Sequence, residues 1–430
     1  MMRAQGFLRW FRIVAAAPVL ALTLGAAAAR ADVKAGEVIS RKNAGLVKDL
    51  VSPGVEWCIN RGMSLKIGEY KKIDLPKAYR DATEKYSSQV KLAADGLKLE
   101  GYVAGLPFPT LDPNDPKIAT KVMWNYEYRW GATDDSDARN FDADTGPVFG
   151  GSTPMSVERH FLLDHIRRLR YVGRLYVDPK PTWESKEGYQ GKSGLHPILE
   201  PFDLKGVGGI SHRYLDPGKH DETWLYLPSL RRVRRLSTAQ RSDALFGQDI
   251  DVDSFSGYDG HIAWMDWKFL GEKQMLGAYH GENYPVKWGP GGADFAFDDV
   301  WEKRPTYVVE GVSKLAQYAY GKRIIFLDKE AMTVSYSDIY DRTGALWKVY
   351  VNLFSMRKQP FAGAKLSVYE DEMPFNPGVF MVDTQLQHAT RVALPSSRYQ
   401  GEEGWYFNLG EKAGTAEEWF TIANLIESGR

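Results

Sequence analysis

Three short segments contain residue types that catalysis could use. A serine stands among glycines in Gly150-Gly151-Ser152-Thr153-Pro154 and in Phe255-Ser256-Gly257, but neither segment has the Gly-x-Ser-x-Gly pattern of a hydrolase nucleophile. The segment Gly289-Pro290-Gly291-Gly292 lacks the lysine and the spacing of a phosphate-binding loop, which indicates a turn. The sequence therefore predicts no catalytic residue, and an unrecognised hydrolase stays only as a minor alternative.

The histidines and acids also fail to reproduce a metal-binding pattern. His160 and His165 are five residues apart, a spacing that does not place them on one face of a helix. The run Asp249–Asp253 begins like a calcium loop, but Ser254 and Gly260 stand where that loop needs a glycine and a bidentate glutamate. We therefore expect neither a metal site nor a cofactor.

A dense group of positive charges stands near the middle of the chain. It consists of Arg231, Arg232, Arg234 and Arg235. Four acids follow soon after and would balance the arginines on a solvated face; they are Asp249, Asp251, Asp253 and Asp259. The functional alternative is a docking patch for an acidic partner or for lipid headgroups, because arginine binds carboxylate and phosphate groups with two parallel hydrogen bonds.

The composition indicates a folded chain. Of the 430 residues, 43% are hydrophobic and 26% are charged, and the mean hydropathy is -0.39, which excludes a disordered chain and a polytopic membrane protein. The first 31 residues hold four arginines and no acid, so the rest of the chain is slightly acidic. This balance argues against nucleic-acid binding. The single cysteine, Cys58, excludes an internal disulfide.

The N-terminus has the pattern of a cleaved secretory signal. Three arginines precede an apolar run over residues 13–24, and Ala29-Arg30-Ala31 supplies a small-residue cleavage site before Asp32. The alternative, a membrane anchor, needs about 20 apolar residues, and this run is shorter. We therefore predict a signal peptide over residues 1–31 and a periplasmic protein, with peripheral association with the outer membrane as a further option.

The region 32–118 is expected to be helical and irregular. The spacing of apolar residues over 36–50 predicts a short helix that Pro53-Gly54 ends. Four prolines between 105 and 116 suit an extended segment lying on another surface. A domain boundary near residue 118 follows.

The next region, 119–394, is expected to be β-structure. In Val122–Trp130 every second residue is apolar. These residues share one face of a strand and are Val122, Trp124, Tyr126, Tyr128 and Trp130. Similar patterns predict strands at Leu169–Val177, Ile210–Tyr214, Glu222–Leu227, His261–Phe269, Tyr307–Val312, Arg323–Leu327, Thr333–Tyr340, Trp347–Phe354 and Val379–Leu386. Short turns between several of them favour antiparallel hairpins.

The last region, 395–430, contains the pattern of an amphipathic helix. Thr415-Ala416-Glu417-Glu418 has the form of a capping box, and Trp419, Ile422 and Ile426 follow at helical spacing. We expect this helix to pack against the sheet.

These elements predict a mainly β fold. A large antiparallel sheet must curl to bury one face, which gives an open half-barrel with helical and irregular N- and C-terminal segments packed on it. The aromatic residues of the strands then either form the core or line a cavity for an apolar ligand. We predict as cavity residues Trp124, Tyr126, Tyr128, Trp224, Tyr226, Trp264 and Trp347.

Several motifs resemble a known family. They are Asp221-Glu222-Thr223-Trp224-Leu225-Tyr226-Leu227-Pro228, Arg231-Arg232-Val233-Arg234-Arg235-Leu236, Asp253-Ser254-Phe255-Ser256-Gly257, Gly105-Leu106-Pro107-Phe108-Pro109, Asp112-Pro113, Asp115-Pro116 and Trp124-Asn125. On these residues the chain resembles domain-of-unknown-function family 1329 (DUF1329). The resemblance spans residues 36 to the C-terminus and implies a core similar to the periplasmic lipoprotein-carrier fold. The resemblance also implies that the protein works together with a resistance-nodulation-division type exporter and an outer-membrane barrel protein. It supplies no catalytic residues.

Together, these observations predict a periplasmic carrier or adaptor, without enzyme activity, that holds a lipid-like hydrophobic ligand and works with an envelope export system. The alternative is a structural or assembly factor at the outer membrane whose cavity is filled by its own helices. A dry aromatic pocket would favour the carrier, and converging polar groups with perturbed pKa values would favour an enzyme.

Overall fold

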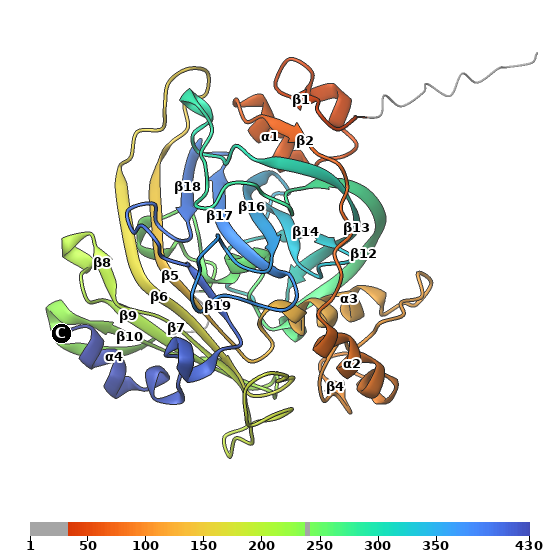
Figure 1. Cartoon of the computed structure of the whole chain (residues 1–430), viewed down its shortest axis with the longest axis vertical. Coiled ribbons are helices and arrows are strands. Elements are labelled where there is room, and N and C mark those ends of the chain that lie inside the picture. Colours follow the sequence, from red (N-terminus) through yellow and green to blue (C-terminus); the bar gives the residue numbers. More distant parts are fainter. Residues whose placement is uncertain (1–32, 237–240) are drawn as a thin grey trace, which may run out of the picture. The chain divides into compact units, whose positions relative to one another are not determined.

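Long antiparallel strands dominate the chain in the computed structural model, which describes residues 33–236 and 241–430 (Figure 1). The prediction of a mainly β fold is confirmed. The predicted signal peptide, residues 1–31, and its cleavage site before Asp32 lie outside the described residues. Residues Val33–Arg430 form one compact unit.

The helices are short and few beside the strands. The α-helices are α1 (Pro53–Asn60), α2 (Lys77–Tyr86), α3 (Ile118–Glu127) and α4 (Ile422–Ser428). The 3₁₀ helices used below are η1 (Ala44–Val47), η5 (Pro228–Leu230), η8 (Val252–Gly257), η9 (Ile262–Trp264) and η12 (Glu417–Phe420).

Seventeen of the strands in the described part of the chain belong to one sheet. They are β1 (Val38–Ile39), β2 (Leu65–Ile67), β5 (Asp135–Pro147), β6 (Arg159–Arg170), β7 (Tyr189–Leu195), β8 (Ile198–Glu200), β9 (Gly208–Tyr214), β10 (Glu222–Leu227), β11 (Arg232–Leu236), β12 (Met265–Gly277), β13 (Val300–Ser313), β14 (Lys322–Asp328), β15 (Val334–Tyr340), β16 (Leu346–Arg357), β17 (Met373–Asp383), β18 (His388–Ala393) and β19 (Trp405–Phe407). A separate small hairpin consists of β3 (Lys91–Leu92) and β4 (Leu99–Glu100).

The sheet runs as an antiparallel series from β12 through β18 and then returns to the early strands. Each of β12 to β17 pairs with the next strand in sequence, and β18 pairs with β5. From β5 the order continues through β6, β7, β9 and β10 to β11. Among the described residues β11 and β12 do not pair with each other, so the curved sheet stays open between these two edges.

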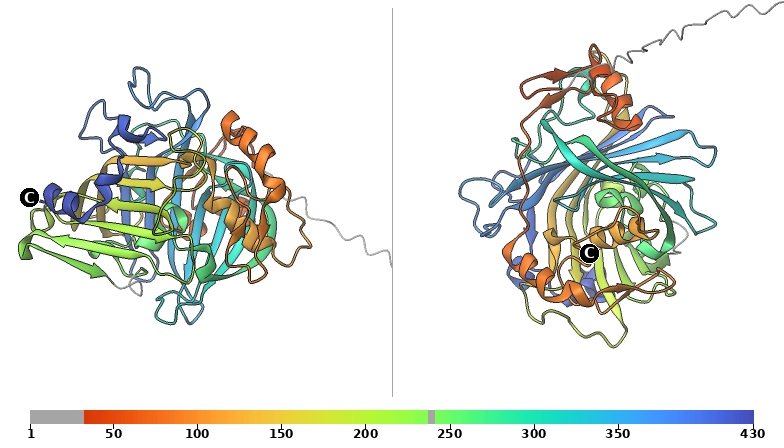
Figure 2. Two further views of the ribbon diagram at one scale, coloured as in Figure 1. Left: turned by 90° about the horizontal axis from the view of Figure 1, so that it is seen from below. Right: turned by 90° about the vertical axis from the view of Figure 1, so that its right-hand side faces the viewer.

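The described chain before β12, residues 241–264, is called the connecting segment and runs along the concave side of the sheet. Its helix η8 contacts β15 and β16, and η9 contacts α3, which in turn contacts β12. Figure 2 shows these segments within the curve of the sheet. Their apolar side chains, including Ile250, Tyr258 and Ile262, join the main hydrophobic core. The concave side is therefore partly filled by the chain itself.

The two ends of the described chain pack elsewhere on the sheet. At the C-terminal end, α4 contacts β9 and β10, and η12 contacts β7. Leu425 of α4 is buried there with Ile210 and Tyr226. At the N-terminal end, α1 contacts β15 and β16, and β2 pairs in parallel with β13, which makes the sheet mixed.

Four predicted elements differ from the structure, and the first is Val122–Trp130. This segment is not a strand, because residues 118–127 form α3. The residues Ile118, Val122 and Tyr126 are also spaced four apart, so the same sequence has an apolar helical face. The alternation of apolar and polar residues does not indicate a strand here, because Met123 and Asn125 are buried as well and the helix is covered on several sides.

The second is the predicted strand Leu169–Val177, which shares only Leu169 and Arg170 with β6.

The other two differences concern helix ends. Pro53-Gly54 does not end a helix over 36–50 but begins α1, where proline is tolerated in the first turn and Ser52 caps the helix. The predicted capping box at Thr415 is also wrong. Helix α4 begins after Thr421, whose side chain accepts a hydrogen bond from the Asn424 amide. None of the helices in the described part of the chain has the length and apolar character needed to cross a membrane.

Candidate functional site

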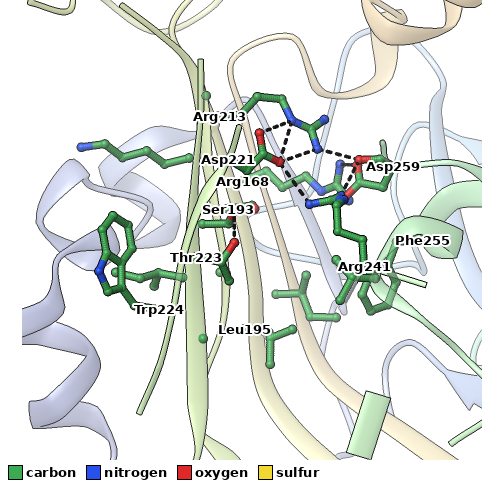
Figure 3. A pocket seen from close by; sticks show the side chains of 18 of the residues that line it. Arg168, Ser193, Leu195, Arg213, Asp221, Thr223, Trp224, Arg241, Phe255 and Asp259 are labelled. Atoms are coloured by element: carbon green, nitrogen blue, oxygen red, sulfur yellow. Dashed lines mark hydrogen bonds and ion pairs between the residues drawn. The ribbon is translucent and has the colours of Figure 1, made fainter. Parts of the chain in front are cut away.

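A cavity lies on the concave side of the sheet, against β6, β7, β9, β10 and β11 (Figure 3). The space open to the centres of water molecules is about 170 Å³, more than ten times the ~10–15 Å³ that one water needs by this measure. The segment between β11 and β12 forms the facing wall through Leu245, Phe246, Val252 and Phe255. The cavity is therefore enclosed by strands on one side and by this connecting segment on the other.

Two rows of opposed residues across neighbouring strands form the sheet wall. The first row is Arg168, Ser193, Ser211, Thr223 and Leu236. The second row is Ile166, Leu195, Gly209, Leu225 and Arg234. Every member of the two rows except Arg234 lines the cavity. The wall is polar along the first row and apolar along most of the second.

An ion-pair network closes one end of the cavity. Arg213 donates to the Asp221 carboxylate with Nη2–Oδ2 at 3.0 Å, and Arg241 donates to the same oxygen from Nη1 at 3.1 Å. Arg168 donates from Nη1 to Asp259 Oδ1 at 2.7 Å. Figure 3 shows the three guanidinium groups and the two carboxylates converging from β6, β9 and the connecting segment. These contacts tie that segment to the sheet.

The charges of this network stabilise each other. Burial alone would raise the pKa of Asp221, but Arg213 and Arg241 lower it below its ordinary value. Burial acts in the same way on Asp259, and the neighbouring arginines, Arg168 first, again lower the pKa. Both carboxylates therefore stay ionised at neutral pH. Groups held in this state are suited to fixing a structure rather than to transferring protons.

A second cavity lies next to the first. Its volume by the same measure is about 130 Å³. Ile166, Arg168 and Phe255 line both cavities, so these three side chains form the partition between them. Phe255 belongs to η8, where the next residue, Ser256, has a φ of 57°, in the left-handed region. The partition thus rests on one aromatic side chain from the connecting segment.

The predicted cavity residues do not lie together. Trp124, Tyr126 and Tyr128 are buried in the main core on or at the end of α3. The Tyr126 hydroxyl donates to the carbonyl of Tyr258, 2.7 Å away. Trp347 belongs to the rim of the same core and donates from Nε1 to Asp383. In the structure, none of these four lines either of the two cavities described above.

The other three predicted residues lie near the cavity, and Trp224 is the one of them that lines it. The Trp264 ring lies under the guanidinium of Arg241, 5.5 Å from the ring centroid. Tyr226 packs beneath α4 on the convex side. Trp224 contributes to the cavity wall, but in Figure 3 its ring lies on the other side of the strands from Arg241 and Phe255.

The alternation of residues in β10 already indicates which side chains share the cavity wall. In β10 the alternation separates Thr223 and Leu225 from Trp224 and Tyr226. The sequence analysis predicts that Trp224 and Tyr226 face the cavity, whereas in the structure the side chains of Thr223 and Leu225 face it. The aromatic side chains instead meet α4, whose apolar residues need a partner.

The predicted arginine group lies on the edge strand β11 and just before it. All four of its members are exposed. Arg235 forms an ion pair with Glu222, with Nη2 and Oε1 2.6 Å apart. Arg231, Arg232 and Arg234 form no ion pair with the residues that the structure describes.

The four acids expected to balance these arginines bind elsewhere. Asp249 accepts from His388 and Thr390, and Asp253 pairs with Arg241. The other two contact Tyr320 and Arg168. The interpretation of the arginines as a face neutralised by these acids is therefore wrong. The carboxylates of Asp249, Asp251 and Asp253 thus have different protein partners.

One other group of acids lies on the outer part of β5 and β6. Carboxylate oxygens of Asp142 and Asp144 and a ring nitrogen of His160 lie within 4.8 Å of one another. Arg391 pairs with Asp144 at 3.0 Å, and Arg398 lies 3.8 Å from Asp142. The acids are thus already neutralised by protein cations, and the group is explained as an ion-pair cluster.

The described structure is thus an open curved sheet with a cavity between the sheet and the connecting segment. The chain belongs to the family described as protein of unknown function DUF1329, whose model matches residues 38–424. A comparison with curated proteins finds no match.

Solved structures similar to this chain are distant. A domain of an outer membrane lipoprotein-sorting protein from Vibrio parahaemolyticus is 18% identical and has a TM-score of 0.46, with 71% of this chain and 97% of that chain covered. A DUF1329 family protein from Desulfovibrio piger is 13% identical with a TM-score of 0.46, covering 71% and 96%. A LolA superfamily protein from Nitrosomonas europaea is 14% identical with a TM-score of 0.38, covering 70% and 94%.

Proposed function

We propose that this protein is a periplasmic carrier that holds a lipid-like ligand in the cavity between the sheet and the connecting segment. The observation that carries the proposal is the wall of the first cavity, which the sheet and the connecting segment form together. Leu195 and Leu225 face Phe246 and Phe255 across a space that side chains leave open. The apolar part of this wall favours an apolar portion of a guest, because water beside these side chains would lack hydrogen-bond partners there.

The charged residues at this site support binding rather than catalysis. Asp221 and Asp259 are each held by arginines, and their pKa values are lowered. A general acid or base works best with a pKa near the working pH. We therefore propose a protein without enzyme activity. Its partners in this proposal are an inner-membrane exporter of the resistance-nodulation-division type and an outer-membrane barrel protein, as the family resemblance implies.

Native purification tests the carrier directly. The full-length precursor is expressed with export, purified without detergent and extracted with organic solvent. Mass spectrometry of the extract is expected to find an apolar or amphiphilic molecule at close to one per protein chain. An extract with no such molecule, together with no binding of added fluorescent fatty-acid probes, would contradict the carrier.

A matched pair of variants tests where the ligand binds. Leu225→Asn places a polar side chain on the cavity wall, and we expect probe affinity to fall because the amide loses hydrogen bonds to water. Leu270→Asn is the control, since Leu270 is 39% exposed on β12 and does not line either described cavity. Equal losses in the two variants would place the ligand elsewhere.

The alternative of a structural or assembly factor has one observation in its favour. The connecting segment and α3 already fill much of the concave side and contribute Tyr126, Ile250 and Tyr258 to the core. A protein with this role would bind neither a co-purifying lipid nor an added probe. The same extraction and binding measurements therefore separate the two functions.

A further inference from the structure

Two arginines of β11, Arg232 and Arg234, lie on the cavity side of the sheet. Leu236 is opposite Thr223 and Arg234 is opposite Leu225 in the register of β10 and β11. Thr223, Leu225 and Leu236 all line the cavity. Because alternate residues of a strand point to the same face, Arg234 and Arg232 share that face.

The apolar row of the wall continues directly into Arg234. Four residues of this row line the cavity, and the fifth position, at the sheet edge, is Arg234. Residues opposite each other on neighbouring strands have Cβ atoms about 4.5–5.5 Å apart. Arg234 also lies two residues from Leu236, roughly 7 Å along the strand. Its guanidinium is thus within reach of a molecule that fills the cavity.

These two positive charges are not neutralised by the described part of the protein. Arg232 and Arg234 are exposed and lack an ion-pair partner there, whereas Arg235, on the opposite face, pairs with Glu222. At the other end of the cavity the opposite holds, because Arg213 and Arg241 are bound to Asp221. The cavity therefore has one end with paired charges and one end with unpaired positive charge.

We propose that the ligand is an amphiphile with an anionic headgroup, which Arg232 and Arg234 bind at the edge of the sheet while the apolar part occupies the cavity. This inference rests on the proposed carrier function and names its substrate class. A wholly apolar ligand would leave the two arginines without a role. A carboxylate or a phosphate headgroup matches the guanidinium, which donates two parallel hydrogen bonds to either group.

The test compares three probes with the same chain length. Dodecanoate and dodecyl phosphate carry the two anionic headgroups, and dodecanol carries none. Binding to the mature protein is measured by calorimetry below the concentration at which the probes form micelles. The wild-type protein is expected to bind at least one anion about tenfold or more tightly than dodecanol, since charged hydrogen bonds contribute on this order. The anion that binds more tightly identifies the headgroup as a carboxylate or a phosphate.

The double variant Arg232→Gln/Arg234→Gln assigns this preference to residues. It is expected to bind anions and dodecanol with affinities within about threefold of each other, with dodecanol binding unchanged. Arg235→Gln is the matched control, because it removes one charge from the same strand on the opposite face. It is expected to keep the preference for anions.

Each contrary result has a definite meaning. If wild-type protein binds dodecanol as tightly as both anions, the headgroup proposal is overturned and the carrier function stands. If it binds none of the three, the carrier function fails as well. Equal effects of Arg235→Gln and the double variant would show a general positive field and overturn the proposal. It would also be overturned if the double variant kept its preference for soluble anions but lost binding to vesicles of anionic phospholipid, which would make the arginines a membrane-docking surface.

Discussion

Arg168 and Asp259 form an ion pair, 2.7 Å from Nη1 to Oδ1, at the place where the two cavities meet. Arg168 comes from β6 in the sheet, and Asp259 comes from the segment that connects β11 and β12. The contact fixes the position of this segment over the cavity. It therefore links the stability of the fold to the shape of the candidate site.

Asp259→Asn is expected to destabilise the protein by about 2–3 kcal/mol. Removing one partner of a buried pair typically costs about 3–5 kcal/mol, because the remaining charge stays without compensation. The expected loss of stability is smaller here, because the Arg168 side chain is 28% exposed and water can solvate its charge. Urea unfolding measures the difference. Asp266→Asn is the control, because that side chain is 75% exposed, and its effect should stay within about 0.5 kcal/mol.

Phe255→Ala is expected to join the two cavities and to shift ligand preference towards longer chains. The side chain of Phe255 lies between the two spaces together with Ile166 and Arg168, and its removal opens a passage beside these two side chains. The measurement is the ratio of affinities for an 18-carbon and a 10-carbon fatty-acid probe. Phe246→Ala is the control, since Phe246 lines the first cavity only and stacks on Phe161. A ratio that changes equally in both variants would argue against the partition.

Gly54→Ala is expected to destabilise the protein by about 2–3 kcal/mol although alanine favours helices. An added Cβ would lie 2.6 Å from Val349 Cγ2 and would meet the Asp338 carboxylate. That carboxylate is fixed, because it accepts hydrogen bonds from Ser52 Oγ at 2.8 Å and from the Gly54 amide at 3.0 Å. Thermal or urea unfolding gives the change in free energy.

Gly45→Ala serves as the control for this substitution. Gly45 lies in η1, and a Cβ there would have no atom within 4 Å. The substitution should be neutral or stabilise the protein by up to about 1 kcal/mol. Destabilisation of similar size in the two variants would show that the close contact at Gly54 is not the cause.

The strands with regular alternation could be predicted from the sequence, and the strands rich in acids could not. Glu222–Leu227 was predicted with the bounds of β10, and Trp347–Phe354 lies within β16. The strand β5 was missed because it carries acids such as Asp135 and Asp137. These are buried with partners from distant segments, for example Asp137 with Arg167. A hydrophobic pattern contains no information on such pairs.

The candidate site was harder to predict than the fold for a related reason. The cavity depends on which face of β10 meets the connecting segment, and both faces are partly apolar. Trp224 and Tyr226 belong to the face covered by α4, whereas Leu225 belongs to the cavity. Only the tertiary arrangement decides between the two. The arginine group is visible in the sequence, but only the contacts in the structure show that Arg231, Arg232 and Arg234 form no ion pair with the described residues, whereas Arg235 pairs with Glu222.

The neutral imidazole of His196 is expected to make stability depend on pH. Its ring stacks on Trp419, with centroids 3.8 Å apart, and Nδ1 is 2.8 Å from Ser428 Oγ, so it anchors the C-terminal segment. Burial lowers the pKa of His196 to about 3, whereas an unfolded histidine has a pKa near 6.5. The unfolded state thus binds a proton below pH 6.5 and the folded state does not, so this contribution to stability is complete above pH 6.5 and is lost as the pH falls.

His196→Gln isolates this contribution from those of the other titrating groups. The variant lacks the imidazole, so its deficit in unfolding free energy relative to wild type should shrink by about 1–2 kcal/mol between pH 7.5 and pH 5. Histidines with the opposite shift, such as His160, whose pKa the Asp144 hydrogen bond raises, contribute equally to both proteins and cancel in the difference. Urea unfolding at the two pH values provides the measurement. A deficit that stays constant would mean that His196 takes up a proton in the folded protein, and that the packing of Trp419 on its ring does not require the neutral form.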